Sequence, residues 1–144
     1  MPKVAFFIYS LGVAERVQGE QREMNIVNPT YILQPDFIPG NFSFAVATSI
    51  FGIDADRPHK LRLRFFHSED RELVVFDTGE SDIPPIRNED STGLPEELRG
   101  IQLAFELRNV VFRKTGRYEA SLEIDGEVLG VYEVYVYPRE SVHS

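Results

Sequence analysis

Apolar and polar residues alternate at every second position along most of the chain. In residues 42–51, Phe42, Phe44 and Val46 share one face, while mostly small residues share the other. Residues 60–66 alternate leucine or phenylalanine with basic residues. Because successive side chains of a strand point to opposite faces, both segments are predicted to be strands with one buried face.

The second half of the chain continues this alternation. It predicts further strands at residues 73–78, 101–108, 117–124 and 127–137. Asp125-Gly126 separates the last two, and an Asp-Gly pair between alternating runs is a strong hairpin signal. We therefore expect the last two strands to pair antiparallel.

Helical signals are scarce. Residues 13–23 have helix-forming composition but a weak apolar stripe and a central Gly19, so they predict a polar loop or a short helical turn. Residues 94–100 predict one helical turn, with Pro95 at its start. The segment 79–99 is rich in proline and glycine, and connections of this length are usually functional or mobile.

These elements predict one domain spanning residues 1–144. Seven or eight strands at this spacing, with at most one or two short helical turns, indicate an all-β fold. We expect an antiparallel two-sheet sandwich, immunoglobulin-like or jelly-roll-like, with a closed barrel as the competing arrangement.

The last 35 or so residues resemble a known structural pattern. Phe112, Gly116 and Tyr118, followed by Asp125-Gly126, are similar to the Gly-x-Tyr corner and hairpin of many immunoglobulin-like sandwiches, and to small uncharacterised bacterial β-sandwich proteins. In such a corner glycine lets the chain turn, and the tyrosine enters the core with its hydroxyl free to bond the backbone. The resemblance implies a fold and no activity.

Composition narrows the classes of partner. The net charge of −8 is opposite to what phosphate binding requires, so we expect no nucleic-acid partner and no anionic membrane surface. The absence of cysteine excludes disulfides, thiolate zinc sites and a cysteine nucleophile. Lys3 and the apolar run after it faintly resemble a signal peptide, but we interpret residues 4–11 as a strand and expect a cytoplasmic protein.

No motif points to catalysis. The most metal-like cluster comprises Asp54, Asp56 and His59, which we interpret as a turn with solvated aspartates. The three histidines lack His-x-His and His-x3-His spacing. There is no Gly-x-Ser-x-Gly and no phosphate-binding loop. We therefore predict no catalytic residue, no metal and no cofactor.

A basic stripe is the first candidate binding surface. It comprises Arg57, Lys60, Arg62 and Arg64. Such a stripe can bind an acidic partner or an anionic sugar, or its cations can pair with acids on neighbouring strands. We favour pairing, because the alternation places three acids on outward faces: Glu106, Glu119 and Glu123.

Two end strands, 4–11 and 128–137, form the second candidate, because both of their faces are apolar. In the later strand, Val128 is expected on the same face as Tyr132 and Val134. A strand with two apolar faces must be covered on both sides. A loop such as 24–39 or 79–99 is the favoured cover. The other reading is an interface whose contacts are Phe7, Tyr9, Tyr135 and Tyr137.

The leading functional hypothesis is a non-catalytic module that binds another protein or a second copy of itself, with 79–99 as an adaptable loop. One alternative is a carbohydrate-binding or carbohydrate-processing sandwich that uses an aromatic platform and loop acids. Another is a structural component of a larger bacterial or phage assembly.

Overall fold

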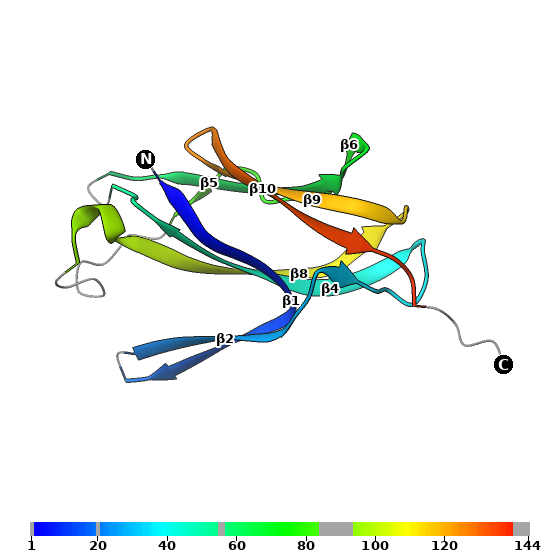
Figure 1. Cartoon of the computed structure of the whole chain (residues 1–144), viewed down its shortest axis with the longest axis horizontal. Coiled ribbons are helices and arrows are strands. Elements are labelled where there is room, and N and C mark those ends of the chain that lie inside the picture. The colour runs from blue at the N-terminus through cyan, green and yellow to red at the C-terminus, as the bar shows by residue number, and fades with distance from the viewer. Residues whose placement is uncertain (1, 20, 55–56, 84–93, 140–144) are drawn as a thin grey trace.

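Two β-sheets pack face to face in the computed structural model of the chain (Figure 1). The structure describes residues 2–19, 21–54, 57–83 and 94–139. Its elements are β1 (Lys3–Gln18), β2 (Gln21–Pro29), β3 (Ile32–Leu33), β4 (Gly40–Phe51), β5 (Lys60–His67), β6 (Asp70–Asp77), β7 (Ser81–Asp82), the 3-10 turn η2 (Glu96–Leu98), β8 (Gly100–Phe112), β9 (Gly116–Ile124) and β10 (Glu127–Val136).

The first sheet has the strand order β2-β1-β4-β8, and the second has the order β3-β10-β9-β5-β6, with β7 also paired to β5. Every pairing is antiparallel except that of β3 with β10 in the described part of the chain. The prediction of an all-β, two-sheet fold is confirmed. The described chain has more strands than the seven or eight expected, because it includes two strands of only two residues.

The predicted hairpin at the end of the chain is confirmed. Strands β9 and β10 pair from Ile124 opposite Glu127 to Gly116 opposite Val136. Asp125 and Gly126 have φ values of 51° and 84°. Positive φ at both central positions is the geometry of a type I′ turn, whose twist matches that of the flanking strands.

The core lies between the inward faces of the two sheets, where the alternation predicted it. Leu61, Leu63 and Phe65 of β5 are buried, as are Phe44 and Val46 of β4. Aromatic rings form the centre of this core: Tyr9, Phe44, Phe65, Phe112 and Tyr118.

The corner between β8 and β9 has the expected construction. Gly116 has φ of 128°, in the region that favours glycine. The Tyr118 hydroxyl donates to the carbonyl oxygen of Lys114 at 2.8 Å. Buried His67 lies edge-on to this ring, and its Nε2 is 3.1 Å from the Thr115 carbonyl oxygen.

The interpretation of residues 13–23 as a loop or helical turn is wrong, whereas the turn predicted at 94–100 is confirmed as η2. Strand β1 continues to Gln18, which pairs with Gln21 of β2. Gly19, with φ of 61°, lies in the turn between them. In residues 13–18, pairing with β2 outweighs the weak helical propensity. Gly19, which disfavours a helix, adopts the positive φ of the hairpin turn.

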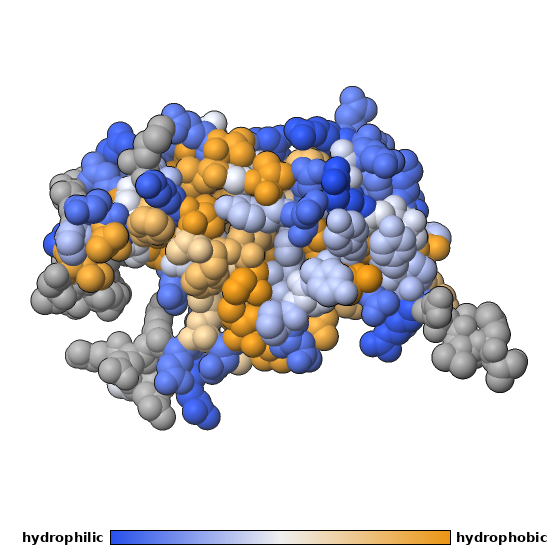
Figure 2. All heavy atoms as spheres, in the orientation of Figure 1, coloured by the Kyte–Doolittle hydropathy of each residue, from blue (hydrophilic) through white to orange (hydrophobic). Residues whose placement is uncertain are grey.

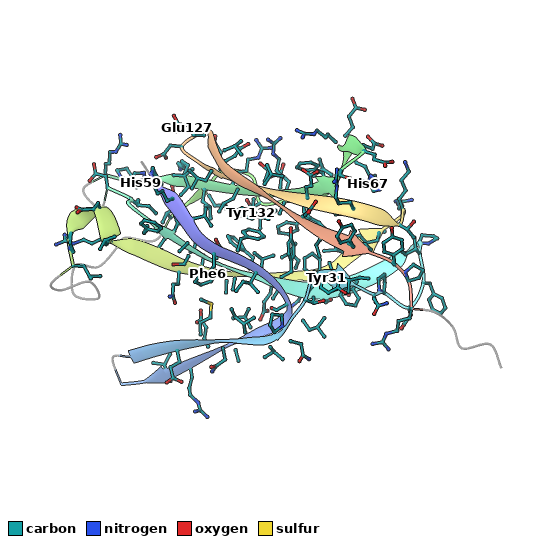
Figure 3. All side chains as sticks on the ribbon, viewed as in Figure 1. Phe6, Tyr31, His59, His67, Glu127 and Tyr132 are labelled. Atoms are coloured by element: carbon teal, nitrogen blue, oxygen red, sulfur yellow. The ribbon has the colours of Figure 1, made fainter. Side chains whose placement is uncertain are left out.

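This hairpin, residues 12–27, is called the hairpin arm below. In the view of Figure 1 it extends below β4 and β8. Ala45 and Ala47 alternate with inward-facing residues of β4 and so point outward, yet they are almost fully buried. Phe6, labelled in Figure 3, lies between the sheet and the arm. Of the segment 24–39 that was anticipated as a cover, residues 24–29 belong to β2, which pairs with β1, and residues 32–33 form β3, which pairs with β10.

Among the described helical segments, none is long and apolar enough to cross a membrane. Of the predicted adaptable loop, residues 81–82 form β7 and residues 96–98 form η2. Residues 84–93 lie outside the described part of the chain.

Candidate functional site

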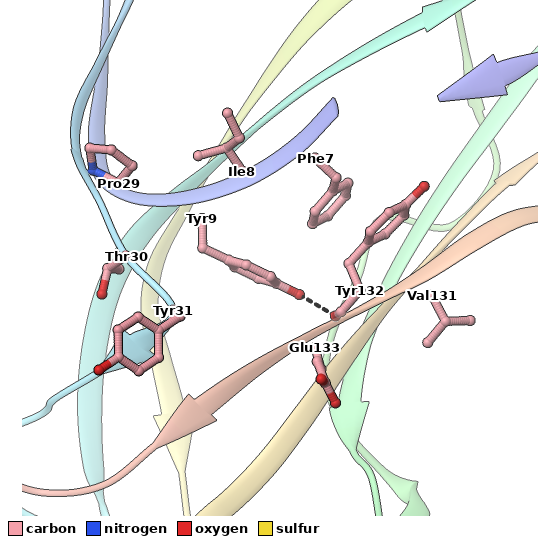
Figure 4. Close-up of a pocket in the computed structure, with 9 residues that line it drawn as sticks. All are labelled: Phe7, Ile8, Tyr9, Pro29, Thr30, Tyr31, Val131, Tyr132 and Glu133. Carbon is pink, nitrogen blue, oxygen red and sulfur yellow. Dashed lines mark hydrogen bonds between the residues drawn. The ribbon is translucent and has the colours of Figure 1, made fainter. Parts of the chain in front are cut away.

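An open groove of about 560 Å³ lies where β1 of one sheet approaches β10 of the other. We call it the seam groove. It is lined by Phe7, Ile8, Tyr9, Pro29, Thr30, Tyr31, Val131, Tyr132 and Glu133 (Figure 4). Seven of these nine are apolar or tyrosine residues, so the groove offers apolar surface with few polar groups.

The floor of the seam groove is held by contacts between the sheets. The Tyr9 hydroxyl donates to the Tyr132 carbonyl oxygen at 2.7 Å. Phe7 stacks on the Tyr132 ring, with centroids 4.3 Å apart and planes 5° from parallel. Burial raises the pKa of Tyr9 well above its ordinary value, so its hydroxyl remains a neutral donor. The floor is thus formed before any ligand arrives.

One wall of the groove is an incompletely paired strand edge. Strand β10 pairs with β9 along one edge, but on the other edge β3 pairs only with Tyr135 and Val136. The Tyr135 amide donates to the Tyr31 carbonyl oxygen at 3.0 Å. Every second residue of a strand presents its backbone to the same edge, so the backbone groups of Val131 and Glu133 also point there. No described strand pairs with them.

Exposed apolar side chains border this edge. Tyr31 is 75% exposed, Val131 47% and Tyr135 38%. Figure 2 shows apolar residues along the middle of this face, with hydrophilic residues along its upper border and on the hairpin arm.

The structure divides the four predicted apolar contacts. Tyr135 and Tyr137 are exposed, whereas Tyr9 is only 4% exposed and Phe7 is partly buried against the core. Tyr9 is therefore largely covered, although it still lines the floor of the seam groove. Its face of β1 is the one that packs against the second sheet.

A β-bulge changes the predicted faces of β10. The register shifts between Val128 and Gly130. Val128 is consequently exposed, while Leu129 packs against the core. The prediction that Val128 shares a face with Tyr132 is wrong, because the extra residue of a bulge reverses the alternation before it.

Tyr31 was missed as a candidate because alternation says nothing about it. It lies between Pro29 and Pro35, in a segment that the sequence marks only as irregular. The sequence signal that could have identified Tyr31 is the presence of an aromatic residue in a proline-rich connection, where side chains are often exposed.

The basic stripe is neutralised by acids, as favoured. Each cation has a carboxylate partner: Arg57 with Asp54, Lys60 with Asp82, Arg62 with Asp77, and Arg64 with Glu123. Only Glu123 was among the three partners proposed from sequence. Hydrogen bonds from Arg62 hold the pKa of Asp77 below its ordinary value. Three of these ion pairs join β5 to neighbouring strands, whereas Arg57 and Asp54 lie three residues apart in the segment before β5.

His59 is held by structural partners at both ring nitrogens. Nδ1 is 2.6 Å from Asp125 Oδ2, and Nε2 is 2.5 Å from the Asp54 carbonyl oxygen. Burial, the largest single influence, lowers the pKa of His59, but the hydrogen bonds with Asp125 and Asp54 and the charge of Asp125 oppose it, and the net shift is upward. Asp56 lies outside the described residues, and those that are described contain no cluster of three potential metal ligands.

Fold and site define the class as a two-sheet, all-β protein with an open groove at its seam. Within that class the chain belongs to DUF6941, described as a family of unknown function, which matches residues 10–137.

No curated protein matches the chain. Among solved structures, it is similar to Pseudomonas fluorescens alkylpurine DNA glycosylase AlkC bound to DNA containing an abasic site analog. The identity is 11% and the TM-score 0.48, over 94% of this chain and 30% of that chain. The chain thus spans less than a third of that protein chain, and a similarity at this level carries no information on function.

Proposed function

We propose that the protein is a non-catalytic binding module that recognises another protein through the seam groove. The observation that carries the proposal is an apolar, tyrosine-lined groove with Tyr31 three-quarters exposed at its border. Tyrosine is enriched at protein interfaces, where it contributes apolar area and a polar tip with few rotatable bonds.

Two further observations support binding rather than catalysis. The floor of the groove is rigidly preformed by the contact between Tyr9 and Tyr132, which reduces the entropy lost on binding. His59, the buried histidine nearest to a carboxylate, already uses both nitrogens to hold Asp125 and the backbone of Asp54.

Site-specific photocrosslinking in the native host tests the proposal. A photoreactive residue would be placed at Tyr31 or Val131, which line the groove and are exposed, with exposed Val17 and Val111 as matched control positions outside the groove. We expect a discrete crosslinked protein from the groove positions and not from the controls. A product of twice the chain mass would identify a second copy as the partner. Equal crosslinking at all four positions, or none, would contradict the proposal.

A second candidate function is sugar binding in the same groove. It is favoured by the exposed ring of Tyr31 together with the carboxylate of Glu133, a pairing that suits stacking and hydrogen bonding to a sugar ring. Thermal unfolding with a panel of oligosaccharides tests it. A rise in Tm that Tyr31→Ala abolishes would support sugar binding, and no rise with any sugar would count against it.

A further inference from the structure

We infer that the outer edge of β10 accepts an extended segment of another protein as an added strand, and that this segment alternates apolar with basic residues. The inference rests on the proposed function and specifies its mode of recognition. In strand addition, backbone hydrogen bonds supply affinity and alternate side chains supply specificity.

The free edge has the length that strand addition requires. Between the bulge and β3, residues Gly130–Val134 form a regular stretch of β10. At about 3.4 Å per residue, this stretch spans about 17 Å. The backbone N–H and C=O groups of Val131 and Glu133 point outward along it and offer up to four hydrogen bonds.

The same edge already accepts a strand at its other end. The amides of Tyr135 and Tyr137 donate to the carbonyl oxygens of Tyr31 and Leu33, so β3 occupies the position that an added strand would continue. The edge is therefore competent for pairing. The stretch Gly130–Val134 contains neither lysine nor proline, two residues that often prevent pairing at a sheet edge, and Glu133 is its one charged residue.

The seam groove explains why alternate residues of the segment should be apolar. A strand added beside β10 lies next to β1, and its inward side chains enter the space bordered by Phe7, Tyr31 and Tyr132. Side chains at the intervening positions point to the outer face, beside Val131, Glu133 and Tyr135.

Charge favours basic residues at those intervening positions. Glu133 is exposed on this stretch and shares Arg117, its only cation in the described part of the chain, with Glu119, while Glu127 is exposed just before the bulge. A second copy is disfavoured as the occupant, because it would place the same glutamates along a common edge between two chains of net charge −8.

The first arm of the test uses a seven-residue peptide with valine at positions 2, 4 and 6 and lysine at positions 3 and 5. Its control is the same peptide with N-methyl groups on the amides that would pair. Calorimetry should show binding that N-methylation weakens at least about tenfold, since each blocked amide removes a backbone hydrogen bond. NMR hydrogen exchange should show new protection of the Val131 and Glu133 amides.

The second arm uses protein variants. Val131→Pro removes a donor on the free edge without removing one from the ladder with β9, so it should fold and lose peptide binding. Should this variant fail to fold, Glu133→Lys provides an independent measurement. It should weaken the lysine peptide about tenfold and strengthen a matched glutamate peptide.

The outcomes separate this inference from the proposed function. If neither N-methylation of the peptide nor Val131→Pro changes the binding affinity, strand addition is overturned. Crosslinking at Tyr31 in the groove would still support a binding module in that case. Absence of binding by the lysine peptide overturns the stated chemistry. A peptide-free dimer in sedimentation, with Val131 and Glu133 already protected, would identify a second copy as the occupant and overturn the choice of a basic segment.

Discussion

Tyr118 fixes the corner between β8 and β9 through one hydroxyl group. That hydroxyl donates a hydrogen bond to the backbone carbonyl oxygen of Lys114 at 2.8 Å, while the ring is fully buried. Burial raises the pKa of Tyr118, and the hydrogen bond to Lys114 only partly opposes this shift, so the group stays neutral.

Tyr118→Phe should lower the free energy of unfolding by about 1 kcal/mol, because it removes one intramolecular hydrogen bond and leaves the ring packing intact. Urea unfolding measures the change. Tyr31→Phe is the matched control, since Tyr31 is largely exposed. Equal stability of the two variants would show that the corner hydrogen bond contributes nothing.

His59 and Asp125 make stability depend on pH. The pKa of His59 is raised from 6.5 in the folded protein, so its contribution is complete below that value and is lost as pH rises through the folded pKa. The pKa of Asp125 is lowered from 3.8, chiefly by the His59 hydrogen bond, so its contribution is lost as pH falls through the folded value. The pair contributes most between these two ordinary values.

Asp125→Asn isolates this pair. Asparagine can still accept from the Lys60 amide and suits the type I′ turn, but it carries no charge. Asp125 is 41% exposed, so solvent screening limits the expected loss to about 1 kcal/mol at pH 5.5. Urea unfolding at pH 5.5 and pH 8.5 should show a smaller loss at the higher pH. An equal loss at both would contradict charge pairing.

At the scale of elements, Gly100 lets the beginning of β8 lie close against the backbone of β4. A Cβ atom there would lie 2.0 Å from the Ile50 carbonyl oxygen and 2.7 Å from the Phe51 Cα. Both are backbone atoms of the paired strand, so they cannot rotate away as a side chain would.

Gly100→Ala should therefore destabilise the protein by about 2 kcal/mol, through separation of the end of the β4–β8 ladder. Gly12→Ala is the control, because its Cβ would meet only Val27, at 4.0 Å. Thermal unfolding should show little change for the control. A similar Tm for both variants would contradict the close approach.

The strands that the sequence predicted share one property: each has a face that the core requires. Residues 42–51 and 60–66 show this in their alternation, and Asp125-Gly126 adds local turn chemistry. The hairpin arm lacks such a face, since no described residue from 11 to 29 belongs to the core cluster. The alternation of apolar and polar residues therefore does not predict the strands of the arm. The bulge in β10 was also not predicted. A bulge adds one residue to a strand, and that residue has no distinctive composition that would mark it in the sequence.

At the scale of the whole molecule, the site was less predictable than the strands. Alternation placed Tyr135 and Tyr137 together on one face of the last strand, but the seam groove exists only because β1 and β10 meet. Tyr9 and Tyr132, which join them, are separated by 123 positions. The strand order brings β1 and β10 together, and a single sequence does not reveal the strand order.

Strand order also predicts which part of the chain folds alone. Strand β10 lies between β3 and β9, and contributes Val134 and Val136 to the core. A fragment ending at Gly126 should lack a cooperative unfolding transition, while the whole chain shows one. Circular dichroism during urea titration compares them. A cooperative transition in the fragment would show that the core closes without β10.

The bond between Tyr9 and the backbone of Tyr132 has a consequence for biosynthesis. During synthesis, the chain must emerge from the ribosome beyond Tyr132 before β1 can reach β10. Until then, phenylalanine-rich ribbons remain exposed to water and to one another, which favours aggregation. Translation speed and chaperone supply should therefore govern the yield of soluble protein more strongly than they would for a helical chain of equal length.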